Sequence, residues 1–237
     1  PHHSASPASL VGGGSRAARP GAIVRAHRGV LFLDEAPEFS RVALDALRQP
    51  LESGCIDVHR AGFTASFPAR FQLVMAMNPC PCGNYGMRGA ECTCPPIAIR
   101  RYAGKLSGPL RDRIDIELRV SRVTAAQASA GGRPQLTTAQ ARRRVLGARE
   151  TAAERWTGTP WHRNAEVPGE RFRHGALRLP ASVRQPLDRA LERGGLTLRG
   201  YDRTLRLAWT MADLSGRGAP GADEIGRALL LKRGLVT

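Results

Sequence analysis

The sequence predicts an α/β domain built on a parallel sheet, followed by an all-helical domain. Two continuous apolar runs, at 30–33 and 71–77, are typical of strands buried in a parallel sheet. Between them, apolar and polar residues alternate over 55–68, which predicts a β-hairpin. After residue 120 the strand signals stop and apolar residues recur at helical spacing. Sheet and helix signals therefore occupy successive parts of the chain.

The other elements of the first part are expected on either side of these strands. The N-terminal residues, rich in Ser, Gly, Ala and Pro, predict a loop with a short helix at 7–11. Ser40 is a suitable N-cap for a helix over 40–52. After the second strand we expect a helix over 96–105 and a third strand over 114–120.

The domain boundaries follow from composition. Gly and Pro in 121–135 predict a linker between a core at 1–120 and a helical domain at 136–237. The core is expected to carry two insertions, the hairpin at 55–68 and a cysteine-containing loop at 79–95. The helical domain is expected to contain helices at 138–156, 180–193, 197–214 and 221–232, with an irregular segment at 157–176.

The composition is strongly basic and limits the classes of partner. The chain has 36 Lys and Arg against 20 Asp and Glu, a formal net charge of +16. This balance favours nucleic acid as a partner, although nearly all the basic residues are Arg, as in many proteins from GC-rich genomes. No stretch approaches the roughly 18 apolar residues of a membrane span. The absence of a signal peptide or a disulfide framework indicates the cytoplasm.

Two adjacent acids end the first apolar strand. Asp34 and Glu35 follow directly on Leu31-Phe32-Leu33, which places both carboxylates at the carboxyl edge of a parallel sheet, where ligands bind. In nucleotide hydrolases the first such acid holds the Mg²⁺ shell and the second orients the attacking water. Alone, the pair is equally compatible with a solvated turn.

Further polar residues recur at the positions that nucleotide hydrolysis requires. Asn78 ends the second strand and can position water against a γ-phosphate. Arg113 precedes the expected third strand and, in a ring of subunits, can reach the neighbouring nucleotide. Arg199 and Arg203 begin a helix of the second domain that can fold over phosphates. Any single Arg in so basic a chain is more often a surface residue, so the prediction depends on the ordered set.

Four of the five cysteines lie in one short segment. Cys80 and Cys82 form one C-x-C pair and Cys92 and Cys94 a second, so four thiols can surround a tetrahedral Zn²⁺. The spacing is tighter than the usual C-x₂-C. Two disulfides and four free thiols are the alternatives.

Several motifs together resemble one family. They are PHHSAS at 1–6, GVLFLDEAPEF at 29–39, LRQPLE at 47–52, MNPCPCG at 77–83, LSGPL at 106–110, LRGYDR at 198–203 and ADL at 212–214. The chain resembles the magnesium-chelatase-like AAA+ ATPases, and within them the ComM/YifB-type branch, over almost its whole length.

The resemblance implies a fold, an activity and a set of residue roles. The fold is the C-terminal part of an AAA+ P-loop NTPase core followed by a helical lid. ComM-type proteins are hexameric ATPases that use ATP and Mg²⁺ to drive branch migration of DNA. By resemblance Asp34 and Glu35 form the Walker B pair and Asn78 is sensor 1. Arg113 is then the arginine finger, and Arg199 is sensor 2 with Arg203 as the substitute.

The sequence departs from the family pattern in one respect. The loop Gly-x-x-Gly-x-Gly-Lys-Ser/Thr, which would bind the phosphates, does not occur in these 237 residues, and neither does a Lon-like N-terminal domain. The resemblance places both upstream of Pro1. We expect this chain alone not to bind ATP productively, either as part of a longer protein or as a degenerate gene product.

The expected hairpin suggests how the chain contacts DNA. Arg60 lies beside its tip, aligned with the pore hairpin of minichromosome maintenance helicases, and a basic tip without an aromatic residue suits phosphate contact. A solvated turn is the alternative. The favoured function is therefore a DNA-translocating motor acting on single-stranded or branched DNA. The alternatives are a chelatase-type motor that remodels a partner protein for Mg²⁺ insertion into a porphyrin, and an inactive fragment that serves only as a binding module.

Overall fold

The computed structural model confirms an α/β part followed by a helical part. It describes residues 1–13, 19–60, 63–87, 89–121, 129 and 136–234. These residues form two compact units, Pro1–Arg113 and Ile114–Thr237. Most of the segment expected as a linker, at 122–128 and 130–135, lies outside the described residues.

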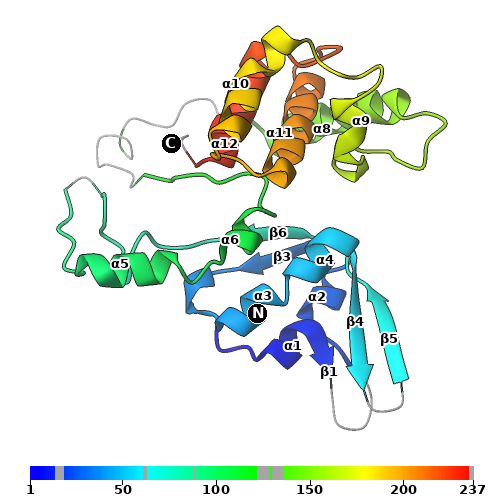
Figure 1. Ribbon diagram of the computed structural model, residues 1–237. Helices are drawn as coiled ribbons and strands as arrows, with labels where there is room; N and C mark the ends of the chain where they lie inside the picture. The colour runs from blue at the N-terminus through cyan, green and yellow to red at the C-terminus, as the bar shows by residue number, and fades with distance from the viewer. Residues whose placement is uncertain (14–18, 61–62, 88, 122–128, 130–135, 235–237) are drawn as a thin grey trace. The chain divides into compact units, whose positions relative to one another are not determined.

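A two-stranded parallel sheet lies at the centre of the first unit (Figure 1). Strand β3 (Val30–Leu33) pairs with β6 (Gln72–Met75), with Leu31 opposite Leu73 and Leu33 opposite Met75. Leu31 and Leu33 point into the core and are buried, whereas Val30 and Phe32 are exposed. This is the alternation of a strand that is covered on one face.

Short helices cover the inner face of this sheet and complete its core. Leu10, Ile23, Leu44 and Leu110 come from four different helices and are buried together with Leu33. The elements of this unit besides its longer strands are α1 (Pro7–Val11), β1 (Gly12–Gly13), β2 (Arg19–Pro20), α2 (Ala22–Arg25), η1 (Ala36–Glu38), α3 (Arg41–Asp45), α4 (Arg48–Ser53), α5 (Pro96–Ala103) and α6 (Gly108–Arg111).

The expected hairpin is present as a separate antiparallel sheet. Strand β4 (Cys55–Arg60) pairs with β5 (Phe63–Pro68), from Cys55 opposite Pro68 to Arg60 opposite Phe63. Ile56 and Val58 point inward and are buried. The expected tip residues 61–62 lie outside the described part of the chain.

The single helix expected over 40–52 is two helices. Ser40 caps the first as predicted, since its hydroxyl accepts a hydrogen bond from the Ala43 N–H at 3.2 Å. Helix α3 ends at Asp45 and α4 begins at Arg48. Pro50 explains the break, because its ring lacks an N–H and would collide with the carbonyl four residues earlier in a continuous helix.

The prediction of a third strand over 114–120 was wrong. This segment has no regular secondary structure, and Leu118 and Val120 are exposed. Its backbone instead contacts the last helix of the second unit, α12 (Ala222–Lys232). The Glu117 N–H donates to the Leu231 carbonyl at 2.8 Å, and the Lys232 ammonium donates to the Ile114 carbonyl. These contacts replace the sheet pairing that the apolar pattern predicted.

The second unit is helical and has its own core. Helix α11 (Leu198–Leu214) is its centre, packing against α8 (Thr138–Arg155), α9 (Gly169–Arg173) and α12. The other elements among the described residues of this unit are η2 (Asn164–Glu166) and α10 (Ala181–Glu192). Aromatic rings fill the core, with Trp156 and Trp209 both against Phe172. Four helices expected from the sequence are therefore confirmed, and the segment taken as irregular contains η2 and α9.

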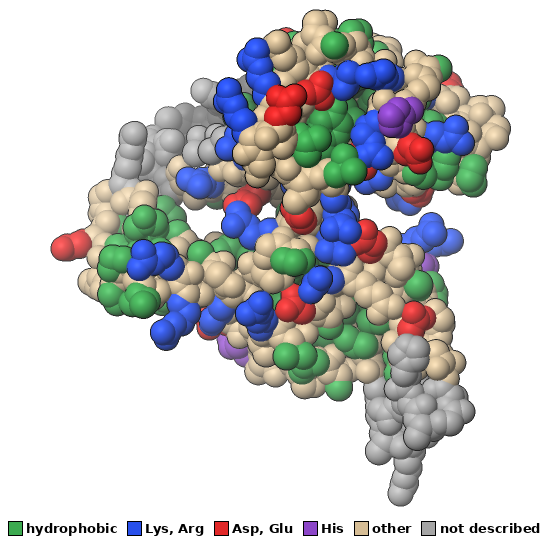
Figure 2. Space-filling model, viewed as in Figure 1, with side chains coloured by type: hydrophobic (Ala, Val, Ile, Leu, Met, Phe, Trp, Pro, Cys, Tyr) green, Lys and Arg blue, Asp and Glu red, His purple; other side chains and the backbone are tan. Residues whose placement is uncertain are grey.

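Both units have strongly charged surfaces. Figure 2 shows Lys and Arg side chains spread over the visible face, interspersed with acidic ones. Among the described residues, no helix is long and apolar enough to cross a membrane.

Candidate functional site

The predicted acidic pair and Asn78 follow neighbouring strands at one sheet edge. Because β3 and β6 are parallel and in register, their carboxyl ends lie side by side. The pairing continues past both strands, since Ala76 N–H donates to the Leu33 carbonyl and Ala36 N–H donates to the Ala76 carbonyl, each at 2.9 Å. Asp34 and Glu35 therefore lie beside the segment that leads to Asn78, at the edge where α/β sheets bind ligands.

Glu35 has an unusual backbone conformation. Its φ of 50° and ψ of 44° are left-handed, a region that costs a non-glycine residue about 1–2 kcal/mol. The Asp34 carboxylate accepts a hydrogen bond from the Glu35 N–H at 2.9 Å, which helps to hold this turn. Both acids are exposed, so oxygen ligands suited to Mg²⁺ are presented to solvent at the sheet edge.

His3 contacts Glu35 and was not selected from the sequence. Its Nδ1 lies 3.2 Å from Glu35 Oε2, and the neighbouring His2 ring stacks on it with centroids 4.0 Å apart. Adjacent histidines at the start of a chain are usually solvent-exposed, so nothing in the sequence pattern selects His3. No spacing rule links it to Glu35, 32 residues later. Only the folded chain brings His3 to the predicted water-orienting acid.

Asn78 is exposed. Its backbone N–H lies close enough to the Tyr102 hydroxyl of α5 to influence the pKa of that group. Burial raises the pKa of Tyr102 above its ordinary value, and the Glu38 and Glu35 carboxylates add to this rise. A Cβ built on Gly83 would lie 4.0 Å from the Asn78 carboxamide. The cysteine loop therefore passes near the Asn78 side chain.

The predicted arginine finger makes contacts within its own unit. Arg113 has a side chain only 10% exposed and is paired with Glu52 of α4. It also donates to the Pro109 carbonyl at 2.8 Å. A role on a neighbouring subunit would require this side chain to leave Glu52. Arg111, at the end of α6, is exposed.

The two sensor 2 candidates differ in environment. Arg199 lies in the first turn of α11 and is exposed. Arg203, one turn further, has a side chain 16% exposed and is bound to Asp115 at 2.7 Å. Arg199 is therefore the more accessible of the two arginines.

The four predicted cysteines lie together. The Cys80 sulfur is 3.4 Å from that of Cys82 and 3.7 Å from that of Cys92, and Cys82 is 3.7 Å from Cys92. All four sulfurs, including that of Cys94, lie within 4.8 Å of one another. Zn–S bonds of about 2.3 Å place the sulfurs of a tetrahedral site about 3.8 Å apart, close to these separations. A disulfide needs about 2.05 Å, and all four thiols are free.

The thiols influence one another's protonation. The Asn84 N–H and the Cys80 thiol, with smaller contributions from Thr93 and Cys94, lower the pKa of Cys82 to about 6. The Cys94 N–H lowers the pKa of Cys92, but desolvation and the Cys82 and Cys80 thiols outweigh it and raise that pKa to about 12. The Cys82 thiol thus loses its proton readily, whereas deprotonation of Cys92 is disfavoured. A bound cation would remove the repulsion between thiolates.

Arg60 is the last residue of β4, so the hairpin carries it to the tip as predicted. The structure describes its backbone position alone.

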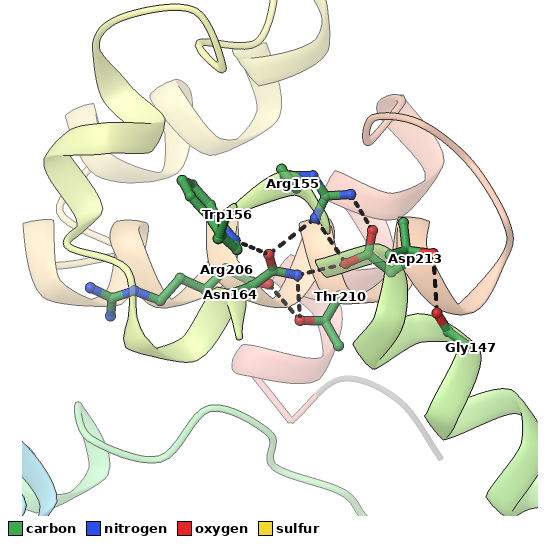
Figure 3. A network of polar contacts seen from close by, with 8 residues as sticks. Gly147, Arg155, Trp156, Asn164, Arg206, Thr210 and Asp213 are labelled. Carbon is green, nitrogen blue, oxygen red and sulfur yellow. Dashed lines mark hydrogen bonds and ion pairs between the residues drawn. The ribbon is translucent and has the colours of Figure 1, made fainter. Parts of the chain in front are cut away.

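A buried polar network in the helical unit was not predicted (Figure 3). Arg155 donates to Asp213 at 3.0 Å and to the Asn164 carboxamide oxygen at 3.2 Å. Asn164 in turn donates to Asp213 at 2.8 Å and accepts from the Trp156 indole at 3.1 Å. Asp213 and Asn164 are buried, and Arg155 lies over the Trp209 ring. The network joins α8, η2 and α11.

Two models of known protein families match the chain, one over most of each unit. Residues 1–128 match the family model described as magnesium chelatase, subunit ChlI, and residues 135–232 match the model of its C-terminal region. The chain belongs to the magnesium chelatase family. Asp34, Glu35 and Asn78 carry oxygen groups of the kind that bind Mg²⁺.

Three relatives show which kinds of magnesium chelatase family protein this chain is similar to. It is 44% identical over 216 residues to the competence protein ComM of Haemophilus influenzae, covering 91% of the chain and 41% of that protein. An uncharacterised protein of Mycobacterium tuberculosis is 52% identical over 233 residues, covering 98% and 45%. The magnesium-chelatase 38 kDa subunit of Cereibacter sphaeroides is 32% identical over 214 residues, covering 90% and 55%.

These matches confirm the ComM/YifB-type resemblance that the motifs indicated. The uncharacterised protein YifB of Escherichia coli is also 41% identical over 214 residues. The chain spans less than half the length of the ComM, YifB and mycobacterial relatives.

Proposed function

We propose that the chain is part of a ring-forming AAA+ motor that couples ATP hydrolysis to movement along DNA. The observation that carries the proposal is the shared sheet edge of β3 and β6, where Asp34, Glu35 and Asn78 follow adjacent parallel strands. In this assignment Asp34 binds the Mg²⁺ shell, Glu35 orients the attacking water and Asn78 contacts the γ-phosphate. The phosphate-binding loop comes from residues outside this sequence.

The test of hydrolysis uses the full-length gene product. Glu35→Gln keeps the size of the side chain but removes the carboxylate that orients water, so kcat should fall by about 100-fold or more while the Kd for ATP stays within about twofold. Glu38→Gln, a nearby acid on η1, is the matched control and should retain activity. A wild-type protein without ATP hydrolysis would contradict the proposal.

DNA is the proposed track, and Arg60 the proposed contact. The net charge of +16, the position of Arg60 at the end of β4 and the similarity to a competence protein support it. Arg60→Ala should abolish the stimulation of hydrolysis by single-stranded or branched DNA and leave basal hydrolysis intact. Arg41→Ala removes the same charge from an exposed position on α3 and should leave stimulation unchanged. Equal stimulation in Arg60→Ala and wild type would contradict the hairpin assignment.

The motor is proposed to act as a homo-oligomer, with a hexamer as the expected ring. Arg113 would then leave Glu52 to reach the nucleotide of the next subunit, and Arg199 would contact the phosphates from the helical unit. Mixing Arg113→Ala with Glu35→Gln subunits tests this arrangement. Complementing interfaces would restore part of the hydrolysis, whereas an arginine acting within its own subunit would restore none.

A chelatase-type motor is the second candidate function. The 32% identity to a magnesium-chelatase subunit favours it. Recovery of tetrapyrrole-pathway proteins, without DNA stimulation of hydrolysis, would support this candidate over the first.

The four-cysteine cluster is proposed to bind a structural Zn²⁺. Its sulfur separations are close to those of a tetrahedral zinc–thiolate site. Metal analysis of the chain purified under reducing conditions should give about one equivalent of zinc. Less than about half an equivalent would contradict this assignment.

A further inference from the structure

We infer that His3 is a positioning residue for Glu35, since its imidazole holds one oxygen of the Glu35 carboxylate and leaves the other to orient water. The inference rests on the proposed function for the role of Glu35. Its basis is the contact between His3 Nδ1 and Glu35 Oε2 at 3.2 Å.

The Glu35 side chain needs a partner if it is to keep one orientation. Its backbone is held by the left-handed turn and by the hydrogen bond to Asp34. The side chain beyond this backbone is long and 52% exposed, so alone it would sample several rotamers. Within the described part of the chain, His3 is the residue that contacts its carboxylate. A contact to one oxygen limits the rotamers and keeps the group accessible to water.

The turn that carries His3 is joined to the packed core of the first unit. The Ala5 N–H donates to the His2 carbonyl at 2.9 Å, which closes a turn around His3. Ala5 packs against the core. Ser6 follows it and caps α1, since its hydroxyl accepts the Ser9 N–H at 3.2 Å. The backbone of His3 is therefore fixed relative to the core that also holds β3.

A second ring restricts the imidazole of His3. The His2 ring lies against it, with centroids 4.0 Å apart and planes inclined by 35°. His2 is itself held in place, because the Ser4 N–H donates to its Nδ1 at 3.2 Å and Ser4 Oγ lies 2.8 Å from the same nitrogen. Rotation of the His3 ring away from Glu35 would disturb this stacked pair.

The chemistry of the contact sets the role of each partner. A carboxylate can only accept a hydrogen bond, so His3 Nδ1 carries the proton and donates. In a neutral imidazole, the hydrogen bonds of the two ring nitrogens determine which of them carries the proton. With Oε2 of Glu35 held in this way, Oε1 stays available to accept a hydrogen bond from the attacking water. A catalytic group displaced by about 1 Å can lose on the order of 100-fold in rate, so this hold matters for hydrolysis.

The first test examines the contact without nucleotide. Side-chain ¹⁵N NMR of the histidines is recorded on the chain at about pH 8, above the ordinary histidine pKa. His3 should show a protonated Nδ1, and Glu35→Ala should shift its signals towards the Nε2–H form. His27 is the internal control for folding of the same unit, because its Nδ1 accepts the Arg70 N–H at 3.1 Å and should stay unprotonated in both proteins. Identical His3 signals in wild type and Glu35→Ala would overturn the inference.

The second test separates the hydrogen bond from a merely structural role in the full-length protein. His3→Ala should lower kcat about tenfold and keep the KM for ATP within about twofold. His3→Asn should restore kcat to within about threefold of wild type, because an asparagine side chain carries an N–H at the position of Nδ1. His162→Ala, at an exposed position in the helical unit, is the matched control and should change neither constant. Equal loss of kcat in His3→Ala and His3→Asn would overturn the hydrogen-bond role.

A double-mutant cycle shows whether His3 acts through Glu35. In a Glu35→Ala background, His3→Ala should lower the residual rate of hydrolysis by no more than about twofold, because the group that His3 positions is already absent. A further tenfold loss would mean that His3 acts independently of Glu35, which contradicts the inference.

The outcomes distinguish this inference from the proposed function. Absence of ATP hydrolysis in the wild-type full-length protein overturns the proposed function, even where NMR detects the contact of His3 with Glu35. Normal kcat in His3→Ala, in a protein where Glu35→Gln loses hydrolysis, overturns the inference and leaves the proposed function.

Discussion

The β3–β6 edge and the network of α8 and α11 use the same residue types in opposite ways. At the edge, Asp34, Glu35 and Asn78 are exposed, and Glu35 adopts a strained backbone. In the network, Asp213 and Asn164 are buried and bonded to several partners. Carboxylates and carboxamides bind ligands where they stay accessible, and they stabilise the fold where protein partners satisfy them. Exposure and hydrogen-bond partners, more than residue type, therefore separate a candidate site from a structural network.

The largest effect should come from breaking the network. Asp213→Ala leaves the Arg155 guanidinium, only 10% exposed, without its carboxylate. Removing one partner of a buried pair costs about 3–5 kcal/mol, so the free energy of unfolding of the helical unit should fall by that amount. Urea unfolding measures it. Glu154→Ala, at an exposed position on α8 next to Arg155, should change the free energy of unfolding by less than about 0.5 kcal/mol. A loss below about 1 kcal/mol for Asp213→Ala would mean that the network is not stabilising.

A second pair of variants asks whether the helical unit is as tightly packed as the network suggests. A Cβ added at Gly169 would lie 2.0 Å from the carboxylate of Asp202, a short side chain that cannot move far. Gly169→Ala should therefore cost about 1–3 kcal/mol. Gly226→Ala on α12 meets nothing within 4 Å and should stabilise by about 0.5–1 kcal/mol. The same sign for both variants in thermal unfolding would contradict this difference in packing.

Strain at the sheet edge can be isolated with two substitutions at one position. Glu35→Gly and Glu35→Ala both remove the carboxylate and its contact with His3, but only glycine adopts the left-handed conformation without strain. Glu35→Gly should be more stable than Glu35→Ala by about 1 kcal/mol. Chemical denaturation of the two variants side by side gives this difference. Equal stabilities would show that the turn at Glu35 relaxes when the side chain is lost.

The smallest expected effect concerns a charge at a helix start. Glu224 is buried and accepts the Gly221 N–H at 2.9 Å; this bond and, to a lesser extent, Arg217 hold its pKa below the ordinary 4.5. A carboxylate with a lowered folded-state pKa stabilises above its unfolded-state pKa, and the stabilisation is lost as pH falls through the folded-state value. At pH 7 the free energy of unfolding of the wild type should exceed that of Glu224→Gln by about 0.5 kcal/mol. The gap should close below about pH 4.5, and a gap that widens on acidification would contradict the assignment.

The sequence predicts those parts of the structure that depend on local residue patterns. Periodicity placed β3, the hairpin and α11 because local pattern determines each of them, and C-x-C spacing was enough to group the four thiols. The strand expected over 114–120 failed because its apolar pattern could not show that α12 would take its backbone bonds. The contact of Glu35 with His3 joins residues far apart in sequence, and no local rule predicts it.

The outer face of the β3–β6 sheet has a consequence for the behaviour of the chain in solution. Val30 is 62% exposed, Phe32 49% and Val74 41%, and all three point away from the covered face of a sheet that has two strands in the described part of the chain. Contiguous apolar side chains beside unpaired strand edges promote self-association. The chain should therefore aggregate as its concentration rises, and Phe32→Lys should raise its solubility limit.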